Sequence, residues 1–261
     1  MNILDKIIEH KKGEVAGNKK NISTAQLMQK PYYNRPVFSL KKFLLDETKN
    51  GIIAEFKRRS PSKGIINSTA DVVEVTKAYT KNGASCLSVL TDDHFFGGSA
   101  DDLLKARINN IPILRKDFII DKYQLVEAKA MGADVILLIA ACLTPDIVQE
   151  LAFFAKSLNL EVLLEIHTET ELTHICDEVD IVGVNNRDLK TFSVDINRSI
   201  ELSKQIPPDK IKIAESGIDD IEAIKKFKDA GFTGFLIGEK FMKEADPGIA
   251  FEQFVQKLKQ G

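Results

Sequence analysis

The chain has 261 residues, of which 44% are hydrophobic and 28% are charged, and its formal net charge is -2. That charge gives no reason to expect nucleic acid or an anionic membrane as a partner. No apolar run reaches the roughly 18 residues of a membrane span, and the charged amino terminus lacks the apolar core of a signal peptide. We therefore expect a cytoplasmic protein, in which Cys86, Cys142 and Cys176 are small buried hydrophobic residues without metal or redox spacing.

The first 48 residues are predicted to form a helical extension. Residues 3–16 have the pattern of an amphipathic helix, with these apolar residues on one side: Ile3, Leu4, Ile7, Ile8 and Val15. Residues 21–36 are polar with few apolar anchors, which predicts an irregular and mobile segment. A second helix is expected over 39–48, with Ser39 as its N-cap. The pattern leaves open whether the extension closes the bottom of the fold or covers its active face.

From residue 51 onward, an apolar segment, a loop and an amphipathic helix repeat. The segments predicted as strands are 52–57, 86–90, 111–116, 135–140, 161–167, 181–185, 211–215 and 235–238. The predicted helices are 71–82, 100–107, 122–131, 145–157, 169–176, 197–205, 221–230 and 248–258. Gly83, Gly132 and Gly231 follow three of the helices and mark their ends, whereas Thr144 and Asp219 mark helix starts.

Eight strands alternating with eight helices predict the α/β class and a single (β/α)8 TIM barrel over 1–261, with 1–48 as the N-terminal helical extension. A doubly wound open sheet is the alternative. It is disfavoured because no Gly-rich dinucleotide-binding turn follows the first strand and no large second domain is present.

The first strand runs directly into charged residues, in the segment GIIAEFKRRSPSKG. Side chains alternate along a strand, so Glu55 and Lys57 share a face with Ile53. In parallel α/β folds ligands bind at the carboxyl ends of the strands. A surface ion pair would look the same, and this segment alone does not distinguish the two.

Polar side chains also end four other predicted strands. In a barrel these groups would meet at one rim: Glu55, Lys57, Lys116, Glu165, Asn185, Arg187 and Glu215. Such a mixture of acids and amines in a cavity shifts pKa values and supports proton transfer, so we favour a catalytic site.

Glycines in the last two strand-end loops predict a phosphate site. Gly217 follows the seventh strand and Gly238 ends the eighth, the usual place for phosphate in barrels. Lys57 and the hydroxyl of Ser60 are placed to reach the same anion from the first strand.

Two further groups of residues, the histidines and a pair of phenylalanines, give weaker signals. The four histidines have no ligand spacing, so no metal site is predicted, and His167 is interpreted as a loop residue rather than a rim residue. Phe95 and Phe96 lie in the loop after the second strand, where they either cover an apolar substrate or pack between helices. We favour the former because this loop lies on the active rim.

The chain resembles the indole-3-glycerol-phosphate synthase family over essentially its whole length. The motifs follow the family's order: IIAEFKRRSPSKG, SVLTDDHFFGGS, ILRKDFIID, ADVILLIAA, LLEIHTETEL, VGVNNRDLKTF, IAESGI and LIGEKFM. The resemblance implies an enzyme of tryptophan biosynthesis, a carboxy-lyase without metal or organic cofactor. Its expected reaction converts 1-(2-carboxyphenylamino)-1-deoxyribulose 5-phosphate into indole-3-glycerol phosphate, carbon dioxide and water.

The resemblance also implies residue roles. Lys116 is the expected general acid at the ketone oxygen, Glu165 assists proton transfer, and Lys57 either binds substrate anions or acts as the second acid. A lysine can be such an acid if burial or neighbouring cations lower its pKa. The remaining matched polar positions are Glu55, Asn185, Arg187, Glu215 and Ser216. The candidates for the apolar slot around the aromatic ring are Phe96, Phe118, Leu137 and Leu189.

One position departs from the family pattern, because Glu239 stands where some members have Ser. We expect its backbone N–H to contact the ligand and its carboxylate to point away. No fused isomerase half is expected, and the protein is expected to be a monomer, or at most a weak homodimer, whose partner is a small phosphorylated substrate. Two other hypotheses remain: a phosphoribosyl isomerase, which would use Asp or Cys at the rim, and a non-catalytic phosphate-binding barrel.

Overall fold

The structure is a computed structural model that describes residues 3–188 and 193–260. Eight strands form a closed parallel barrel: β1 (Ile52–Phe56), β4 (Cys86–Leu90), β5 (Ile113–Lys116), β6 (Val135–Ile139), β7 (Glu161–Ile166), β8 (Ile181–Asn185), β9 (Ile211–Glu215) and β10 (Gly234–Ile237). β1 pairs with both β4 and β10, so the sheet has no free edge. The predicted TIM barrel is confirmed.

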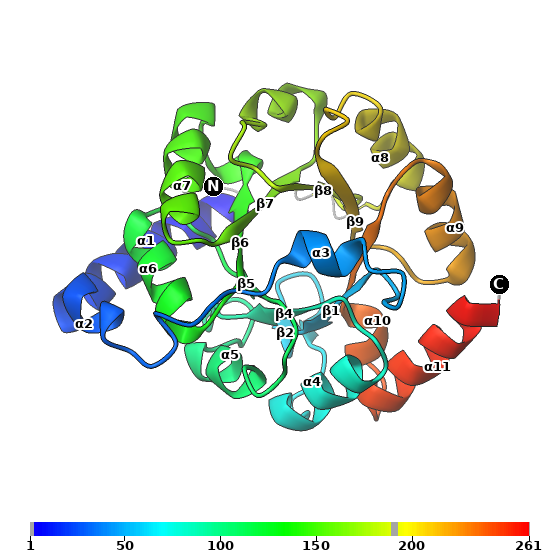
Figure 1. Cartoon of the computed structure of the whole chain (residues 1–261), viewed down its shortest axis with the longest axis horizontal. Helices are drawn as coiled ribbons and strands as arrows, with labels where there is room; N and C mark the ends of the chain where they lie inside the picture. Colours follow the sequence, from blue (N-terminus) through cyan, green and yellow to red (C-terminus); the bar gives the residue numbers. More distant parts are fainter. Residues whose placement is uncertain (1–2, 189–192, 261) are drawn as a thin grey trace.

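Helices cover the outside of the barrel (Figure 1). They are α4 (Val72–Lys81), α5 (Ala100–Ala106), α6 (Lys122–Met131), α7 (Pro145–Ser157), α8 (Ile196–Ser203), α9 (Ile221–Asp229), α10 (Glu239–Met242) and α11 (Pro247–Gln260). The N-cap of α9 is Asp220, one residue after the predicted start at Asp219, because the Asp220 carboxylate accepts the N–H of Ala223. Residues predicted as the helix at 169–176 form a 3-10 helix, η2 (Glu169–His174), and a second short one, η1 (Ala140–Cys142), follows β6.

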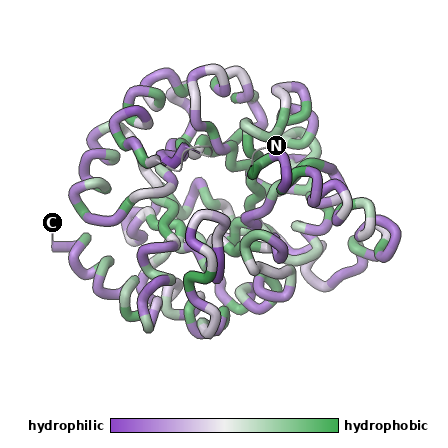
Figure 2. Tube along the Cα trace, turned by 180° about the vertical axis from the view of Figure 1, so that it is seen from behind, coloured by the Kyte–Doolittle hydropathy of each residue, from purple (hydrophilic) through white to green (hydrophobic). Residues whose placement is uncertain are grey.

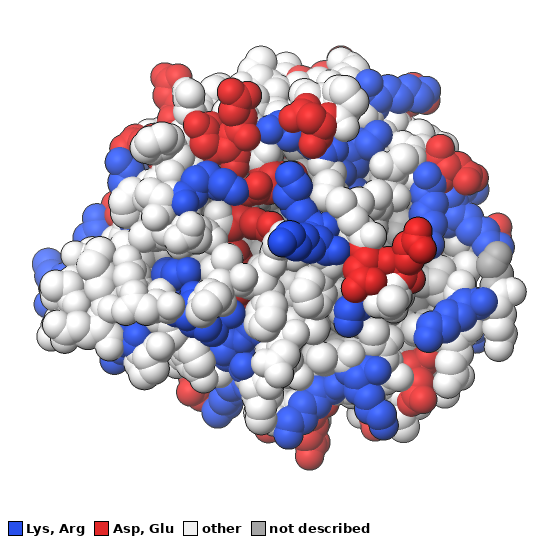
Figure 3. All heavy atoms as spheres, in the orientation of Figure 1, with Lys and Arg blue, Asp and Glu red and all other residues white. Residues whose placement is uncertain are grey.

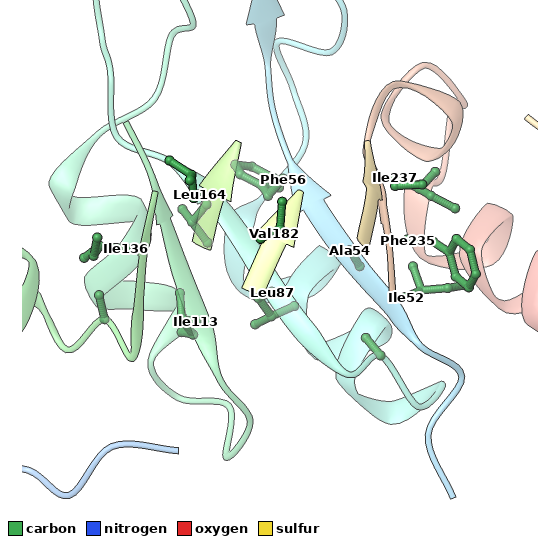
Figure 4. Close-up of a cluster of buried hydrophobic side chains, with 14 of the residues drawn as sticks. Ile52, Ala54, Phe56, Leu87, Ile113, Ile136, Leu164, Val182, Phe235 and Ile237 are labelled. Atoms are coloured by element: carbon green, nitrogen blue, oxygen red, sulfur yellow. The ribbon is translucent and has the colours of Figure 1, made fainter. Parts of the chain in front are cut away.

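The strands separate two apolar regions. Ile52, Ala54 and Phe56 point outward into the large cluster between barrel and helices, as Figure 4 shows. Ile53 lies instead in the barrel interior, together with Leu114, Leu137, Leu163, Ile181, Ile213 and Leu236. The predicted alternation along β1 is therefore confirmed, and it turns Glu55 and Lys57 toward the barrel axis.

The extension covers both ends of the barrel. It contains α1 (Ile3–Asn21), α2 (Thr24–Met28) and α3 (Leu40–Leu44). The short α3 crosses the opening seen in Figure 1, and its Leu40 and Leu44 join the interior apolar cluster. α1 runs along the opposite side, where Figure 2 shows the amino-terminal end of the chain near the barrel opening. Among the described residues, no helix is long and apolar enough to cross a membrane.

The prediction for residues 21–36 is wrong in two respects. The segment contains the helix α2, which Ser23 and Gln26 close with a capping box. It also has anchors, because Leu27 is buried in a cluster with Tyr123 and Val126 of α6, and Arg35 pairs with the buried Asp134. A lack of apolar anchors is therefore no reason to expect residues 21–36 to be mobile.

Two further differences from the prediction concern the helix that precedes β1 and the segment that follows β1. The helix expected over 39–48 is only five residues long, although Ser39 caps it as predicted. A small hairpin of β2 (Arg59–Ser60) and β3 (Gly64–Ile65) follows β1, in place of a plain loop. Acidic and basic side chains are mixed over the face drawn in Figure 3, in agreement with the small net charge.

Candidate active site

A pocket of about 240 Å³ lies at the carboxyl ends of the strands. The predicted residues that line it are Glu55, Lys57, Ser60, Phe96, Lys116, Phe118, Leu137, Glu165, Asn185, Arg187, Glu215, Ser216, Gly217, Gly238 and Glu239. Leu189 lies outside the described residues. The structure thus brings the described candidates together around one cavity, as the barrel topology requires.

The ammonium of Lys116 lies between two carboxylates at the centre of the pocket. Its Nζ donates to Glu165 Oε2 at 3.0 Å and to Glu215 Oε2 at 2.8 Å. The three residues come from β5, β7 and β9, whose last or next-to-last residues turn inward. Both carboxylates are buried, so these charges interact strongly with one another.

The pKa of Lys116 is not lowered in this free site, so the condition stated for a lysine acid is not met before substrate binds. Burial disfavours the ammonium, but the carboxylates of Glu165, Glu215 and Glu55 outweigh burial and raise the pKa of Lys116. Lys116 therefore carries its proton throughout the physiological range. Protonation of a neighbouring carboxylate would remove one counterion and make the ammonium a stronger acid.

Glu165 has a second set of partners on its other oxygen. Asn185 Nδ2 donates to Glu165 Oε1 at 3.0 Å, and His167 Nε2 lies 3.3 Å from the same oxygen. Burial opposes ionisation, but Lys116 and His167 outweigh it and lower the pKa of Glu165. His167 follows the last residue of β7 and does not line the pocket, as its interpretation as a loop residue predicts, but it is buried against Glu165.

Glu215 is held differently. Burial raises its pKa to about 7, because the attraction of Lys116 is offset by the repulsion of Glu165. Its Oε1 is buried without a hydrogen-bond partner among the described residues. This oxygen lies over Gly183 of β8, where a side-chain Cβ would come within 2.2 Å of it. Gly183 therefore leaves the space that the Glu215 carboxyl group occupies.

The second lysine of the pocket pairs with an acid of its own strand. Lys57 Nζ lies 2.6 Å from Glu55 Oε1. Glu55 in turn packs against Gly238, where an added Cβ would lie 2.6 Å from Glu55 Oε1. The pair is thus fixed beside the loop that follows β10.

The backbone after β9 turns sharply through two residues in the left-handed region. Ser216 and Gly217 both have φ values of +66°. Asn186 Nδ2 donates to the carbonyl oxygen of Ser216 at 2.7 Å and holds this turn. Anion-binding concavities of the backbone combine right-handed and left-handed residues, so this turn alone does not identify one. The phosphate site at Gly217 stays a prediction.

Glu239 lies at the mouth of the pocket, next to the expected phosphate site. Its carboxylate oxygens lie 3.7 Å from an Arg187 guanidinium nitrogen and 3.6 Å from Lys63 Nζ. The carboxylate thus pairs with cations of two other loops, from the β2–β3 hairpin and from the end of β8.

An apolar wall completes the pocket. The rings of Phe96 and Phe118 lie 5.9 Å apart. A second contribution, not predicted from the sequence, comes from Ile3, Leu4 and Ile7 of α1. Phe95 points elsewhere and packs against two histidine rings, those of His10 and His94.

Lys11 of α1 was also missed. Its buried ammonium lies 2.9 Å from both Asp92 and Asp117, at the ends of β4 and β5. The spacing of four residues between Ile7, Lys11 and Val15 places all three on one buried face, which is a signal present in the sequence. Within residues 3–188 and 193–260, no group of three or more His, Cys, Asp or Glu could hold a metal ion.

A family model described as indole-3-glycerol phosphate synthase matches residues 4–254. The chain belongs to the indole-3-glycerol phosphate synthase family. A relative of that name from Bacteroides thetaiotaomicron is 49% identical over 98% of both chains, and one from an Acidovorax species is 40% identical over 96% of this chain and 98% of that one. The family is one of carboxy-lyases.

A solved structure shows the fold alone. The structure of 3-hexulose-6-phosphate synthase from Salmonella typhimurium has a TM-score of 0.63 with 13% identity, and the match covers 81% of this chain and 99% of that one. At this identity the likeness supports the barrel and says nothing of the substrate.

Proposed function

We propose that this member of the indole-3-glycerol phosphate synthase family converts 1-(2-carboxyphenylamino)-1-deoxyribulose 5-phosphate into indole-3-glycerol phosphate in the pocket described above. The observation that supports this proposal most is the central arrangement, in which the Lys116 ammonium lies between Glu165 and Glu215. It offers a proton donor beside two groups that can accept protons.

The first bond is formed when the ring carbon that bears the carboxylate attacks the ketone carbon. The ketone oxygen then takes a proton from Lys116, whose ammonium is fully protonated in the free site. Loss of carbon dioxide returns the bonding electrons to the ring and restores its aromaticity. The former ketone oxygen is now a hydroxyl group on the new five-membered ring.

The last step is loss of this hydroxyl as water. An acid must protonate the hydroxyl, and a base must remove a proton from the adjacent methylene carbon. We assign these tasks to a carboxyl group beside Lys116 and to the pair formed by Lys57 and Glu55.

The ends of the substrate fit the two ends of the pocket. The turn at Ser216 and Gly217, the backbone at Gly238 and the side chains of Ser60 and Arg187 are assigned to the phosphate. Phe96, Phe118 and Leu137 are assigned to the aromatic ring. We further propose that the protein acts in the cytoplasm as a monomer or weak homodimer and needs no cofactor.

A fluorescence assay of turnover tests the function. The chain contains no Trp, so indole emission from the product stands out against four Tyr. We expect the wild type to form product and Lys116→Met to lose about 10²–10⁴-fold in kcat, the usual contribution of a positioned acid. Circular dichroism controls for folding. A folded wild type without turnover would contradict the proposal and favour a different phosphate-binding barrel.

A further inference from the structure

Glu165 and Glu215 flank Lys116 almost symmetrically, but only one of them has additional partners. The Oε2 atom of each glutamate accepts a hydrogen bond from the Lys116 ammonium, at 3.0 Å for Glu165 and 2.8 Å for Glu215. Glu165 Oε1 faces Asn185 and His167, whereas Glu215 Oε1 has no hydrogen-bond partner among the described residues. The difference between the two carboxylates therefore lies in what surrounds Glu165.

His167 is buried beside Glu165, outside the lining of the pocket. It is 6% exposed, and its Nε2 lies 3.3 Å from Glu165 Oε1 while its Nδ1 lies 3.7 Å from Glu171 Oε2. Both contacts are longer than a well-formed hydrogen bond, so the interaction is mainly one of charge. Glu171 is fixed because its Oε2 accepts the backbone N–H groups of His167 and Thr168, at 2.5 and 3.2 Å.

We propose, on the basis of the proposed function, that His167 is a positioning residue. Its imidazolium keeps Glu165 as the carboxylate anion, so that Glu215 is the group that takes up and releases a proton beside Lys116. His167 touches neither the substrate pocket nor Lys116 and acts through Glu165.

The electrostatics of the free site agree with this assignment. Burial disfavours the charged ring, but Glu165 and Glu171 outweigh burial and raise the pKa of His167 to about 9. The pKa of Glu165 is lowered, whereas that of Glu215 is raised to about 7. Near neutral pH, Glu215 is thus poised to exchange protons while Glu165 stays ionised.

The groups around His167 come from several elements. β7 contributes Glu165, η2 contributes Glu171, and β8 contributes the neutral Asn185. η1, which packs on β7 and η2, contributes Cys142, whose thiol stays protonated because burial, Glu165 and Glu171 raise its pKa. Lys116 of β5 faces Glu165 from the other side. His167 is therefore the cation that distinguishes Glu165 from Glu215 in this group of residues.

The test follows the two carboxylates directly by NMR titration of protein labelled with ¹³C at the glutamate carboxyl carbon, between pH 5.5 and 9.5. In the wild type we expect Glu215 to titrate near neutral pH while the Glu165 signal stays constant. In His167→Asn we expect both signals to move in the same step, because the proton is then shared. The ring of His167, followed in ¹⁵N-labelled wild type, should stay protonated to about pH 9.

His174→Asn is the matched control. This histidine lies in η2, and its ring nitrogens face the backbone carbonyls of Glu171 and Leu143 rather than Glu165. Its replacement should leave the two glutamate titrations as in the wild type. In turnover, His167→Asn should lower kcat by at least about tenfold, part of the ~10²–10⁴-fold contribution of positioned acids and bases, with a smaller change in KM.

Two results would overturn the inference: a wild-type His167 that is neutral at pH 7, or a Glu165 signal that stays constant in His167→Asn as it does in the wild type. The wild-type titration does not depend on the variant's folding. Because it also needs no turnover, failure of the proposed function and failure of this inference are seen separately.

Discussion

The ammonium nitrogen of Lys11 lies 2.9 Å from a carboxylate oxygen of Asp117, and neither side chain is exposed to solvent. Asp117 also pairs with Arg115 at 3.0 Å, and it directly follows Lys116 in the chain. Burial opposes the charge on Asp117, but Arg115 and Lys11 outweigh it and lower its pKa to about 2. One buried charge network thus joins the amino-terminal helix α1 to the strand that carries Lys116.

Lys11→Met should therefore destabilise the protein strongly. The change leaves Asp92 and Asp117 buried with one cation fewer, a loss that typically costs about 3–5 kcal/mol. Chemical denaturation would measure it as a lower free energy of unfolding. We also expect a higher KM, because α1 brings Ile3, Leu4 and Ile7 to the pocket.

Lys12→Met is the control for this change. Lys12 lies one residue further along the same helix and pairs with Glu9 at 3.6 Å, where both side chains are mostly exposed. Such a surface pair contributes at most about 1 kcal/mol. Equal stabilities for the two variants would show that the buried network does not hold α1 in place.

Local patterns made most of the fold predictable from the sequence, but not the contacts between distant segments. The bounds of β8, β9, α6 and α7 agree with the prediction, since buried parallel strands are apolar runs and the helices have capping residues. The rim residues were found because the barrel topology brings all strand ends together. The ion pairs of Lys11 and His167 were missed because their partners lie on other elements. For Lys11, the four-residue spacing indicates a buried face but does not identify the carboxylates that it meets.

Gly183→Ala should reduce activity through Glu215. The added Cβ would lie 2.2 Å from Glu215 Oε1 and 3.2 Å from Leu163 Cδ1, so the carboxyl group must move. A displacement of about 1 Å in a catalytic group can cost about 10²-fold in rate. We expect a kcat loss of that order in the turnover assay, measured at a temperature at which circular dichroism shows both proteins folded.

Gly13→Ala provides the comparison with a glycine that has free space around it. Gly13 lies within α1, and apart from its chain neighbours and the nearby backbone of its own helix, no described atom lies within 4 Å of the added Cβ. Alanine in a helix interior stabilises by roughly 0.5–1 kcal/mol relative to glycine, and kcat should not change. If Gly183→Ala were as active as Gly13→Ala, the space over Gly183 would not matter for catalysis.

The stability of the protein should depend on His167 in alkaline solution. The pKa of this ring rises from 6.5 to about 9 on folding, so the native state holds a proton that the unfolded chain releases between these values. The contribution is fully present below pH 6.5 and is lost as the pH rises to 9. By linkage it amounts to on the order of 3 kcal/mol.

Denaturant titrations at pH 6, 7.5 and 9 would measure this dependence. The free energy of unfolding of the wild type should fall over that range, and the fall should be smaller in His167→Asn than in the wild type and in His174→Asn. Parallel pH dependences for all three proteins would show that His167 is neutral in the native state.

Glu239→Ser should strengthen substrate binding. The carboxylate of Glu239 lies within 4 Å of Arg187 and Lys63, at 3.7 and 3.6 Å, and thus competes with the substrate's phosphate for the same cations. These two pairs are partly exposed, so each contributes at most about 1 kcal/mol, and KM should fall by no more than about thirtyfold. Since salt screens exposed charges, the difference from the wild type should shrink between 0.05 and 0.5 M salt, roughly the range over which the Debye length falls from above to below 10 Å.

Glu244→Ser removes the same charge from an exposed position just after α10, away from the lining of the active-site pocket. It should leave KM close to the wild-type value at every salt concentration. Steady-state kinetics of the three proteins, compared side by side, separate the local effect of Glu239 from that of net charge. A KM that rises in Glu239→Ser would mean that this carboxylate helps to place Arg187 or Lys63 for the substrate, and the competition argument would then be wrong.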